Sequence, residues 1–289
     1  MKIDKNLEVQ STIDTTQTRD KIINRLDIDR KILGRTIIKR DVENITDKWN
    51  VNYSKYHKNL SETVEELNKM FELATIIDNE VIKVNRIDVA TDLDVKFDEV
   101  GKFISFYFMC FTEGLGGVRR RWTDIDLEEV DALWFKKQYL EVQYYNKEKQ
   151  AKENGFEAAY PTRLEVRLKR TEKQDFKYHI DRTIKMYQEV PEKISYVEQD
   201  RINLLCKKWD RFKEDNNGAT LTHFVMAWED RIYTKEILKG LYKYVGLKGS
   251  FNEWLKWYNR KHKLELFTDK DILKLNKMII KSLKEYKKN

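Results

Sequence analysis

A tyrosine stands near the end of a short stretch in which apolar and polar residues alternate. Over residues 139–146 the alternation has the period of a β-strand that is buried on one side. The apolar side carries Leu140, Val142 and Tyr144, and the polar side carries Glu141, Gln143 and Tyr145. A tyrosine at the polar end of a strand can keep its hydroxyl accessible and act as a nucleophile when a base or a cation assists it. Tyr145 is therefore the first candidate for chemistry.

Two further segments alternate in the same way, with acids and bases on their polar sides. These polar sides carry Arg86, Asp88, Ala90 and Asp92 in the first segment, and Arg163, Glu165, Arg167 and Lys169 in the second. If the three strands share one sheet, their charged side chains lie on one face of it with Tyr145 among them. Acids on such a face could hold a divalent metal ion, and bases could hold a phosphate group.

The three segments, in this order, resemble the rolling-circle replication initiators of small Gram-positive plasmids, the Rep_trans family. The R-x-D-x-A-x-D strand of that family is matched by Arg86–Asp92, and its tyrosine in an I-Y-N/D-K context is matched by residues 144–147. Its R-x-E strand, with basic residues after the Glu, is matched by Arg163–Arg170. The resemblance covers residues 81–170 and extends more loosely to about residue 35.

The resemblance implies that Tyr145 attacks phosphorus in origin DNA, which leaves a 5′-phosphotyrosine and a free 3′-hydroxyl. It implies a divalent ion, Mg²⁺ or Mn²⁺, for which Asp88 and Glu165 are the preferred ligands. Asp92 shares the side of Asp88 but lies roughly 13 Å along the strand, so the two cannot easily bind one ion. Phosphate and DNA contacts are expected from Arg86, Lys147, Arg163, Arg167 and Lys169.

The residues also allow plainer interpretations. Tyr145 could be a packed or surface tyrosine, and the acids could form cross-strand salt bridges with Arg86 or Arg163. The chain departs from the family at Gln150, where many relatives have Glu, and at Tyr144, where an aliphatic residue is usual. Glu141 adds an acid on the side of Tyr145 that could displace Asp88 as a ligand. No histidine stands in a His-x-His pair.

The composition fits a nucleic-acid partner without requiring one. Among 289 residues, 36 % are charged, the net charge is +7, and there are seven Trp and fifteen Tyr. A protein from an AT-rich genome would carry the same excess of Lys, Asn and Ile, so charge alone leaves the two alternatives open. The sequence shows no secretory segment and no stretch of membrane-spanning length, and it predicts a cytoplasmic protein with Cys110 and Cys206 as buried thiols.

The expected fold is α+β, with a mainly antiparallel sheet that has helices on one face and the active site on its open face. We expect a polar arm at residues 1–34, of which 1–20 are loose, a catalytic domain at 35–175, and a helical C-terminal region at 176–289 that binds DNA or a partner. In the second region, a hairpin is predicted near residues 36–53 and a helix begins at Ser61.

Further helices are predicted at Phe97–Thr112, from Phe176 to near Pro191, at residues 221–233 and at Phe251–His262. Residues 124–131 are an acidic stretch, and the strand that carries Tyr145 is expected to run into a charged turn.

The predicted function is nicking and rejoining of origin DNA, single-stranded or in a cruciform, in rolling-circle replication of a plasmid or phage. A host helicase and a second copy of the chain are further predicted partners, and no membrane is involved. A conjugative relaxase with the same chemistry, a non-catalytic sequence-specific DNA-binding protein on the same fold, and a basic interaction module are the alternatives.

Overall fold

The structure is a computed structural model that describes most of the chain. The described residues are 7–20, 37–41, 46–52, 60–62, 65, 83–123, 130–153, 155, 157–169 and 176–288. The helix predicted from Ser61 falls largely outside these ranges, as does the acidic stretch at 124–129.

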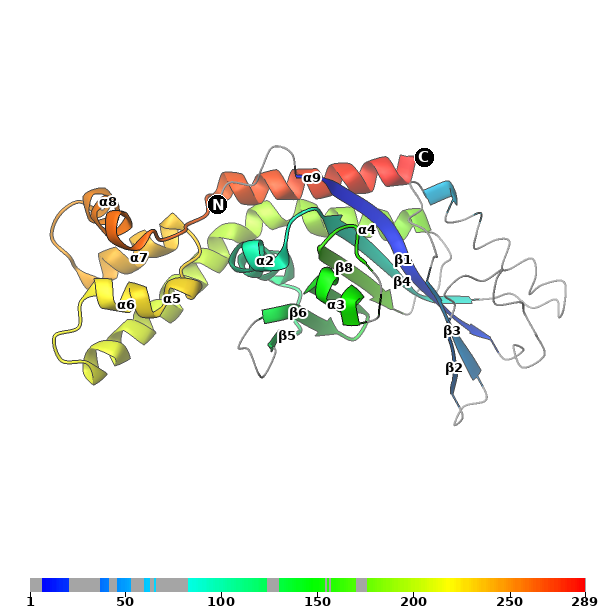
Figure 1. The fold of residues 1–289 in the computed structure, drawn as a ribbon, viewed down its shortest axis with the longest axis horizontal. Coiled ribbons are helices and arrows are strands. Elements are labelled where there is room, and N and C mark those ends of the chain that lie inside the picture. The colour runs from blue at the N-terminus through cyan, green and yellow to red at the C-terminus, as the bar shows by residue number, and fades with distance from the viewer. Residues whose placement is uncertain are drawn as a thin grey trace. The chain divides into compact units, whose positions relative to one another are not determined.

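Strands and helices follow one another in an α+β order (Figure 1), which confirms the expected fold class. The strands are β1 (Val9–Asp20), β2 (Ile37–Asp41), β3 (Thr46–Asn52), β4 (Lys83–Leu93), β5 (Val118–Thr123), β6 (Val130–Lys137), β7 (Leu140–Asn146) and β8 (Thr162–Lys169). The helices are α2 (Phe97–Thr112), α3 (Lys147–Glu153), α4 (Phe176–Gln188), α5 (Val190–Asp215), α6 (Leu221–Ala227), η2 (Glu229–Arg231), α7 (Lys235–Val245), α8 (Phe251–His262) and α9 (Asp269–Lys288).

The described strands form one eight-stranded sheet in the order β2-β3-β1-β4-β8-β7-β6-β5. Each neighbouring pair is antiparallel, and the predicted hairpin is the pair β2–β3. The three strands that carry the motifs therefore lie next to one another as β4, β8 and β7, although β8 comes last in the chain. The prediction that they share one sheet is confirmed.

The N-terminal segment is not a loose arm. Val9–Asp20 forms strand β1, which pairs with β3 on one side and with β4 on the other. Ser11 and Thr12 are buried, and the Ser11 hydroxyl lies 3.1 Å from that of Thr91 on β4. The strand escaped prediction because polar residues stand on both of its faces, which removes the apolar alternation, while Thr itself favours strands. The boundaries expected for the three regions stay predictions.

The apolar face of the central strands forms the core of the sheet. Its members are almost fully buried and include Ile87, Val89, Val142, Leu164 and Val166. Helix α4 packs against β4, and the hydroxyl of its Tyr187 lies near that of Tyr144 on β7. Because Tyr144 belongs to this face, α4 covers the apolar face of the sheet.

The chain divides into two compact units, each made of separate segments. The sheet unit contains Leu7–Asp98, Gly116–Gln188 and the chain from Met278 onward, and the helical unit contains Glu99–Leu115 and Glu189–Lys277. In the sheet unit, the Lys287 ammonium near the end of α9 lies 2.5 Å from the Asp181 carboxylate on α4. Helix α4 therefore contacts the last turns of α9 within this unit.

The helical unit has its own aromatic core. The rings of Phe103 and Phe267 meet edge to face with centroids 5.1 Å apart, and the Tyr107 hydroxyl donates to Asn276 at 2.6 Å. Helices α5 and α7 approach so closely that a Cβ at Gly240 would come within 2.5 Å of the Ile202 side chain. Of the helices described, none has the length and apolar content needed to cross a membrane.

Several helix boundaries differ from the predicted ones. Pro191 does not end a helix but stands in the first turn of α5, where its missing N–H costs nothing. The helix expected at residues 221–233 is the shorter α6 followed by the 3₁₀ turn η2. The predicted helices at Phe97–Thr112 and Phe251–His262 are confirmed, and both cysteines are free and buried as expected.

Candidate active site on the polar face of the sheet

The polar sides of β4, β8 and β7 align into rows that run across the three strands. Asp88 stands opposite Arg167, which stands opposite Glu141. The next row contains Ala90, Glu165 and Gln143, and the third contains Asp92, Arg163 and Tyr145. We call this set of side chains, together with Arg86, Lys169 and Lys147, the polar face. The pairing register thus brings the predicted site residues of all three strands together.

Tyr145 makes the contact that bears most directly on chemistry. Its hydroxyl donates a hydrogen bond to Glu165 Oε2 at 3.1 Å, diagonally across from β7 to β8. Tyr145 is partly exposed, whereas Glu165 is only 2 % exposed. A tyrosine whose proton already points at a carboxylate has the first feature of an activated nucleophile, a base within hydrogen-bond reach.

Arg167 lies at the centre of three acids. Its Nε donates to Glu165 Oε1 and lies 3.7 Å from Asp88 Oδ2, and its Nη1 lies 3.8 Å from Glu141 Oε1. Burial lowers the pKa of the Arg167 guanidinium, but the charges of Glu165 and Asp88 outweigh this and raise it above its usual value. Arg167 therefore stays charged and balances acids on all three strands.

Asp88 is a buried acid whose pKa is raised by its surroundings. Arg86 donates to both of its oxygens, one of them at 2.6 Å from Nε. Burial raises the pKa of Asp88, the negative charge of Glu165 raises it further, and the arginines only partly offset this, so that it reaches about 7. Asp88 and Glu165 are close enough to repel each other, and a cation between them would relieve that repulsion.

Asp92 lies in a separate, fully buried ion-pair cluster. Its Oδ1 and Oδ2 accept from Arg163 at 2.6 Å and 2.9 Å, and its Oδ2 also accepts from Lys147 at 2.7 Å. Lys147 is placed there because Asn146 caps helix α3, accepting from the Lys149 N–H at 2.9 Å. The stretch expected to be a charged turn is this helix. It ties the end of β7 to β4 across β8.

Glu141 is held by neighbours on two strands. Trp134 on β6 donates its indole N–H to Glu141 Oε1 at 2.6 Å, and Lys169 pairs with Oε2. Burial would raise the pKa of Glu141, but the hydrogen bonds from Lys169 and Trp134 prevail and lower it. The Trp134 contact was not foreseen, because the pairing of β6 with β7 sets it and no sequence motif marks it.

The polar face is less open than expected. Asp88, Asp92 and Glu165 are each at most 2 % exposed, because cationic side chains lie against their carboxylates. Arg86 and Arg167 keep 21 % of their side-chain surface exposed and Lys169 keeps 29 %. Arg163 and Lys147 keep 5 % and 9 %. The cations of the face therefore divide into three that reach the surface and two that do not.

Among the described acids of the polar face, Asp88 and Glu165 are the two that could share a small hard cation. Among the residues described, no three His, Cys, Asp or Glu side chains converge into a metal-binding group. Asp88 and Glu165, whose charges interact, offer two carboxylates, and Mg²⁺ is commonly held by one or two carboxylates together with water and phosphate oxygens. Asp92 already accepts from two cations, and its role as a ligand stays a prediction.

Comparison with known proteins adds little to this geometry. No protein-family model matches the chain, and neither does any curated protein. Among solved structures, the chain is similar to a rolling circle replication initiator protein from Geobacillus stearothermophilus, with 12 % identity and a TM-score of 0.32. The match covers 57 % of this chain and 76 % of the other. A likeness of this extent carries no argument about chemistry, and membership of the Rep_trans family stays a prediction.

Proposed function

We propose that the protein is a DNA nicking and rejoining enzyme that starts rolling-circle replication of a plasmid or phage, with Tyr145 as its nucleophile. The observation that carries the proposal is the hydrogen bond from the Tyr145 hydroxyl to Glu165, on a face that combines buried acids with surface-reaching cations. The three ordered segments that resemble Rep_trans initiators support the same reaction.

The phosphate group is assigned to the cations that reach the surface. Arg86, Arg167 and Lys169 each pair with an acid and keep a fifth or more of their side-chain surface exposed. An incoming phosphodiester can therefore contact them without unburying an ion pair, and an arginine suits two phosphate oxygens at once. Arg163 and Lys147 position the strand ends through Asp92, and their predicted phosphate contacts are left to experiment.

The reaction transfers a phosphoryl group from a 3′ oxygen of DNA to tyrosine, so one phosphoester bond forms as another breaks. Tyr145 Oη attacks phosphorus and gives its proton to Glu165, the O–P bond to tyrosine forms, and the bond from phosphorus to the 3′ oxygen breaks. The 3′ oxygen leaves and takes a proton, so the products are a 5′-phosphotyrosine and a free 3′-hydroxyl. Attack by a 3′-hydroxyl on the phosphotyrosine reverses the step and rejoins the strand.

Asp88 and Glu165 are the residues proposed to hold Mg²⁺ or Mn²⁺. When bound, such an ion would polarise the scissile phosphate and neutralise charge that develops on its oxygens. Its arrival would also favour the ionised form of Asp88, whose pKa is raised to about 7 by burial and by Glu165. The helicase partner and a dimer of the chain stay predictions.

One observation favours a second candidate, a DNA-binding protein without catalysis. Every acid of the polar face is paired with a cation, which is also the pattern of a structural salt-bridge floor. On that account the Tyr145 hydroxyl only completes the network, and its contact with Glu165 has no chemical role.

A strand-transfer assay separates the two candidates. The purified protein is incubated with Mn²⁺ and a library of 3′-labelled single-stranded oligonucleotides, and covalent adducts, which retain the 3′ part of the strand, are resolved on a denaturing gel. Glu165→Gln keeps the shape of the side chain but cannot take the proton, so adduct formation should fall by about 10²–10⁴-fold. The matched control is Glu157→Gln, an exposed acid outside the polar face. If the unaltered protein forms no adduct, the non-catalytic candidate is favoured, whereas equal adduct yields from both variants would mean that Glu165 is not the base.

A further inference from the structure

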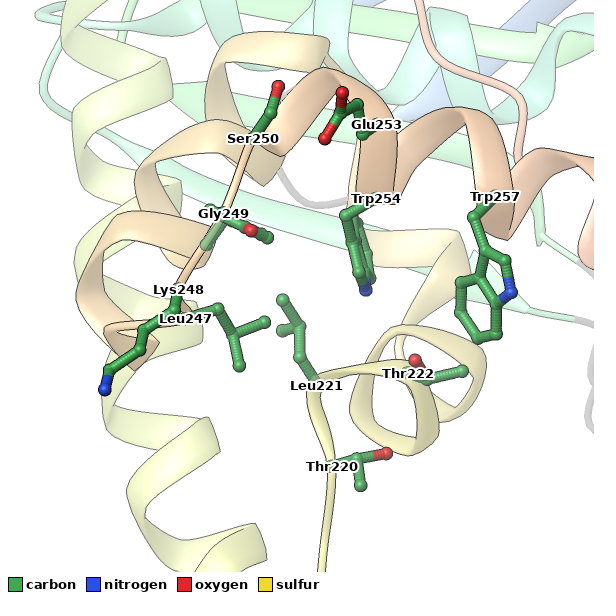
Figure 2. A pocket seen from close by; sticks show the side chains of 11 residues that line it. Thr220, Leu221, Thr222, Leu247, Lys248, Gly249, Ser250, Glu253, Trp254 and Trp257 are labelled. Atoms are coloured by element: carbon green, nitrogen blue, oxygen red, sulfur yellow. The ribbon is translucent and has the colours of Figure 1, made fainter.

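The helical unit contains an aromatic cavity that the nicking chemistry does not use. It has a volume of about 460 Å³ and lies between the start of α6, the loop after α7 and helix α8 (Figure 2). This volume falls within the range of about 300–1,000 Å³ that is common for sites of small molecules. Its lining includes Leu221, Thr222, Leu247, Lys248, Trp254 and Trp257.

Two tryptophans of α8 give the cavity one fixed wall and one exposed ring. The Trp254 ring is held among Tyr242, Phe251 and Tyr258, with centroids 5.6, 6.4 and 5.4 Å away. Trp257, one turn further along α8, is 42 % exposed. Figure 2 shows both side chains extending from α8 toward the turn that carries Thr222. An exposed tryptophan next to a rigid one forms a preformed surface for stacking.

The segment around the cavity is strongly basic. Residues 247–263 contain five Lys or Arg and one acid, Glu253. The Lys248 side chain lies at the edge of the cavity, and the Lys261 ammonium lies 4.9 Å from the centre of the Trp257 ring. The combination of aromatic rings with surrounding cations is that of proteins that bind single-stranded nucleic acid.

We propose that this cavity binds an unpaired base of single-stranded DNA, stacked on Trp257, with Lys248 and Lys261 near the flanking phosphates. That the occupant is DNA rests on the function proposed above. A duplex does not fit the same role, since its bases are stacked on one another and offer no free face. Glu253 would repel a phosphate but can accept from an exocyclic amino group, which favours cytosine over thymine at this position.

Binding of a single strand to the full-length protein tests the proposal. The probe is a fluorescein-labelled oligo(dC) of about 12 nucleotides, within the span of single-strand sites, followed by fluorescence anisotropy in EDTA so that no strand is cut. Trp257→Ala should weaken binding about tenfold, the loss expected for one stacked base. Trp257→Phe keeps a flat ring and should recover most of the affinity. Oligo(dT) should bind the unaltered protein more weakly than oligo(dC).

The matched control is Tyr196→Ala, which removes another exposed aromatic ring of the helical unit, 72 % exposed on α5. It should leave binding unchanged. If Trp257→Ala, folded by circular dichroism, binds as tightly as the Tyr196 variant, the proposal is wrong and the cavity serves a partner of another class, such as a peptide.

The outcome is separable from that of the nicking proposal. Trp257 is not part of the polar face, so Trp257→Ala should still form the Tyr145 adduct when the oligonucleotide is present well above its weakened affinity. If no adduct forms with any variant but the Trp257 contrast holds, the nicking function fails and the base-binding site stands. If adducts form but Trp257→Ala binds as tightly as the control, the nicking function stands and the base-binding site fails.

Discussion

The two faces of strand β7 hold adjacent tyrosines in opposite environments. Tyr144 lies on the apolar face, is fully buried and has its hydroxyl near that of Tyr187 of α4. Tyr145 lies on the polar face, is partly exposed and donates to Glu165. Burial raises the pKa of Tyr187 far above its ordinary value, and the interaction with Tyr144 offsets this only in part, so Tyr187 stays protonated.

In the proposed reaction, the face of the strand on which a tyrosine lies decides whether it can be the nucleophile. The residue type is the same at both positions, and the Tyr145 hydroxyl is the one that donates to Glu165 on the polar face. A substitution on the polar face should therefore alter the reaction and leave stability nearly intact, and a substitution on the apolar face should do the opposite.

The largest effect is expected from removal of the Tyr145 hydroxyl. Tyr145→Phe keeps the ring and removes only the attacking atom, so adduct formation should fall by about 10³-fold or more. Tyr144→Phe should retain most of the activity, because its side chain lies on the other face. Initial rates of adduct formation at saturating oligonucleotide measure both. Comparable losses of adduct formation in the two variants would mean that the face on which the tyrosine lies does not decide which one reacts.

Asp92 is the exception on the polar face, because its substitution should reduce the free energy of unfolding. Asp92→Asn would leave Arg163 and Lys147 buried with their carboxylate partner removed, which costs about 3–5 kcal/mol of the free energy of unfolding. Urea denaturation measures the loss, with Asp94→Asn, an exposed acid just beyond β4, as the control that should change little. If Asp92→Asn is as stable as that control, the Asp92 cluster does not hold the strand ends.

The free energy of unfolding should depend on pH through the titration of Asp88. Its folded pKa of about 7 lies above the unfolded value near 3.9, so the folded protein retains this proton while the unfolded chain has lost it. Stability from this group is thus fully present below about pH 4 and is lost as pH rises toward 7. Relative to Asp88→Asn, the unaltered protein should lose about 1–3 kcal/mol across that window in urea titrations. Parallel curves for the two proteins would show that Asp88 does not titrate there.

The smallest effect is expected on the apolar face. Tyr144→Phe removes a buried hydroxyl that interacts with Tyr187 and should cost about 1 kcal/mol in the free energy of unfolding. Tyr145→Phe should change that free energy by no more than about 0.5 kcal/mol, since its side chain is partly exposed. Chemical denaturation of the two variants in parallel gives the comparison. A greater loss in Tyr145→Phe than in Tyr144→Phe would reverse the expected roles of the two faces.

The sequence predicts what depends on neighbouring residues and misses what depends on distant ones. Alternation placed Asp88, Glu165 and Tyr145 on polar sides, because side-chain direction follows from position along one strand. It could not give the register, and register alone puts Tyr145 beside Glu165 and ties Lys147 to Asp92, 55 positions away. Strand β1 was missed for a related reason, since its described buried side chains, Ser11 and Thr12, are polar and the strand is defined by its pairing with β3 and β4.

Tyr145 is proposed to become covalently bound to DNA, and mass spectrometry of a trapped adduct can identify the modified residue. Adducts trapped with single-stranded DNA and Mn²⁺ are digested with nuclease and trypsin, and the modified residue is located by fragmentation in a mass spectrometer. The account predicts a nucleotide joined through its 5′ phosphate to Tyr145, absent in Tyr145→Phe and present in Tyr144→Phe. A nucleotide on Tyr144, or on a tyrosine of the helical unit such as Tyr233 or Tyr258, would contradict it.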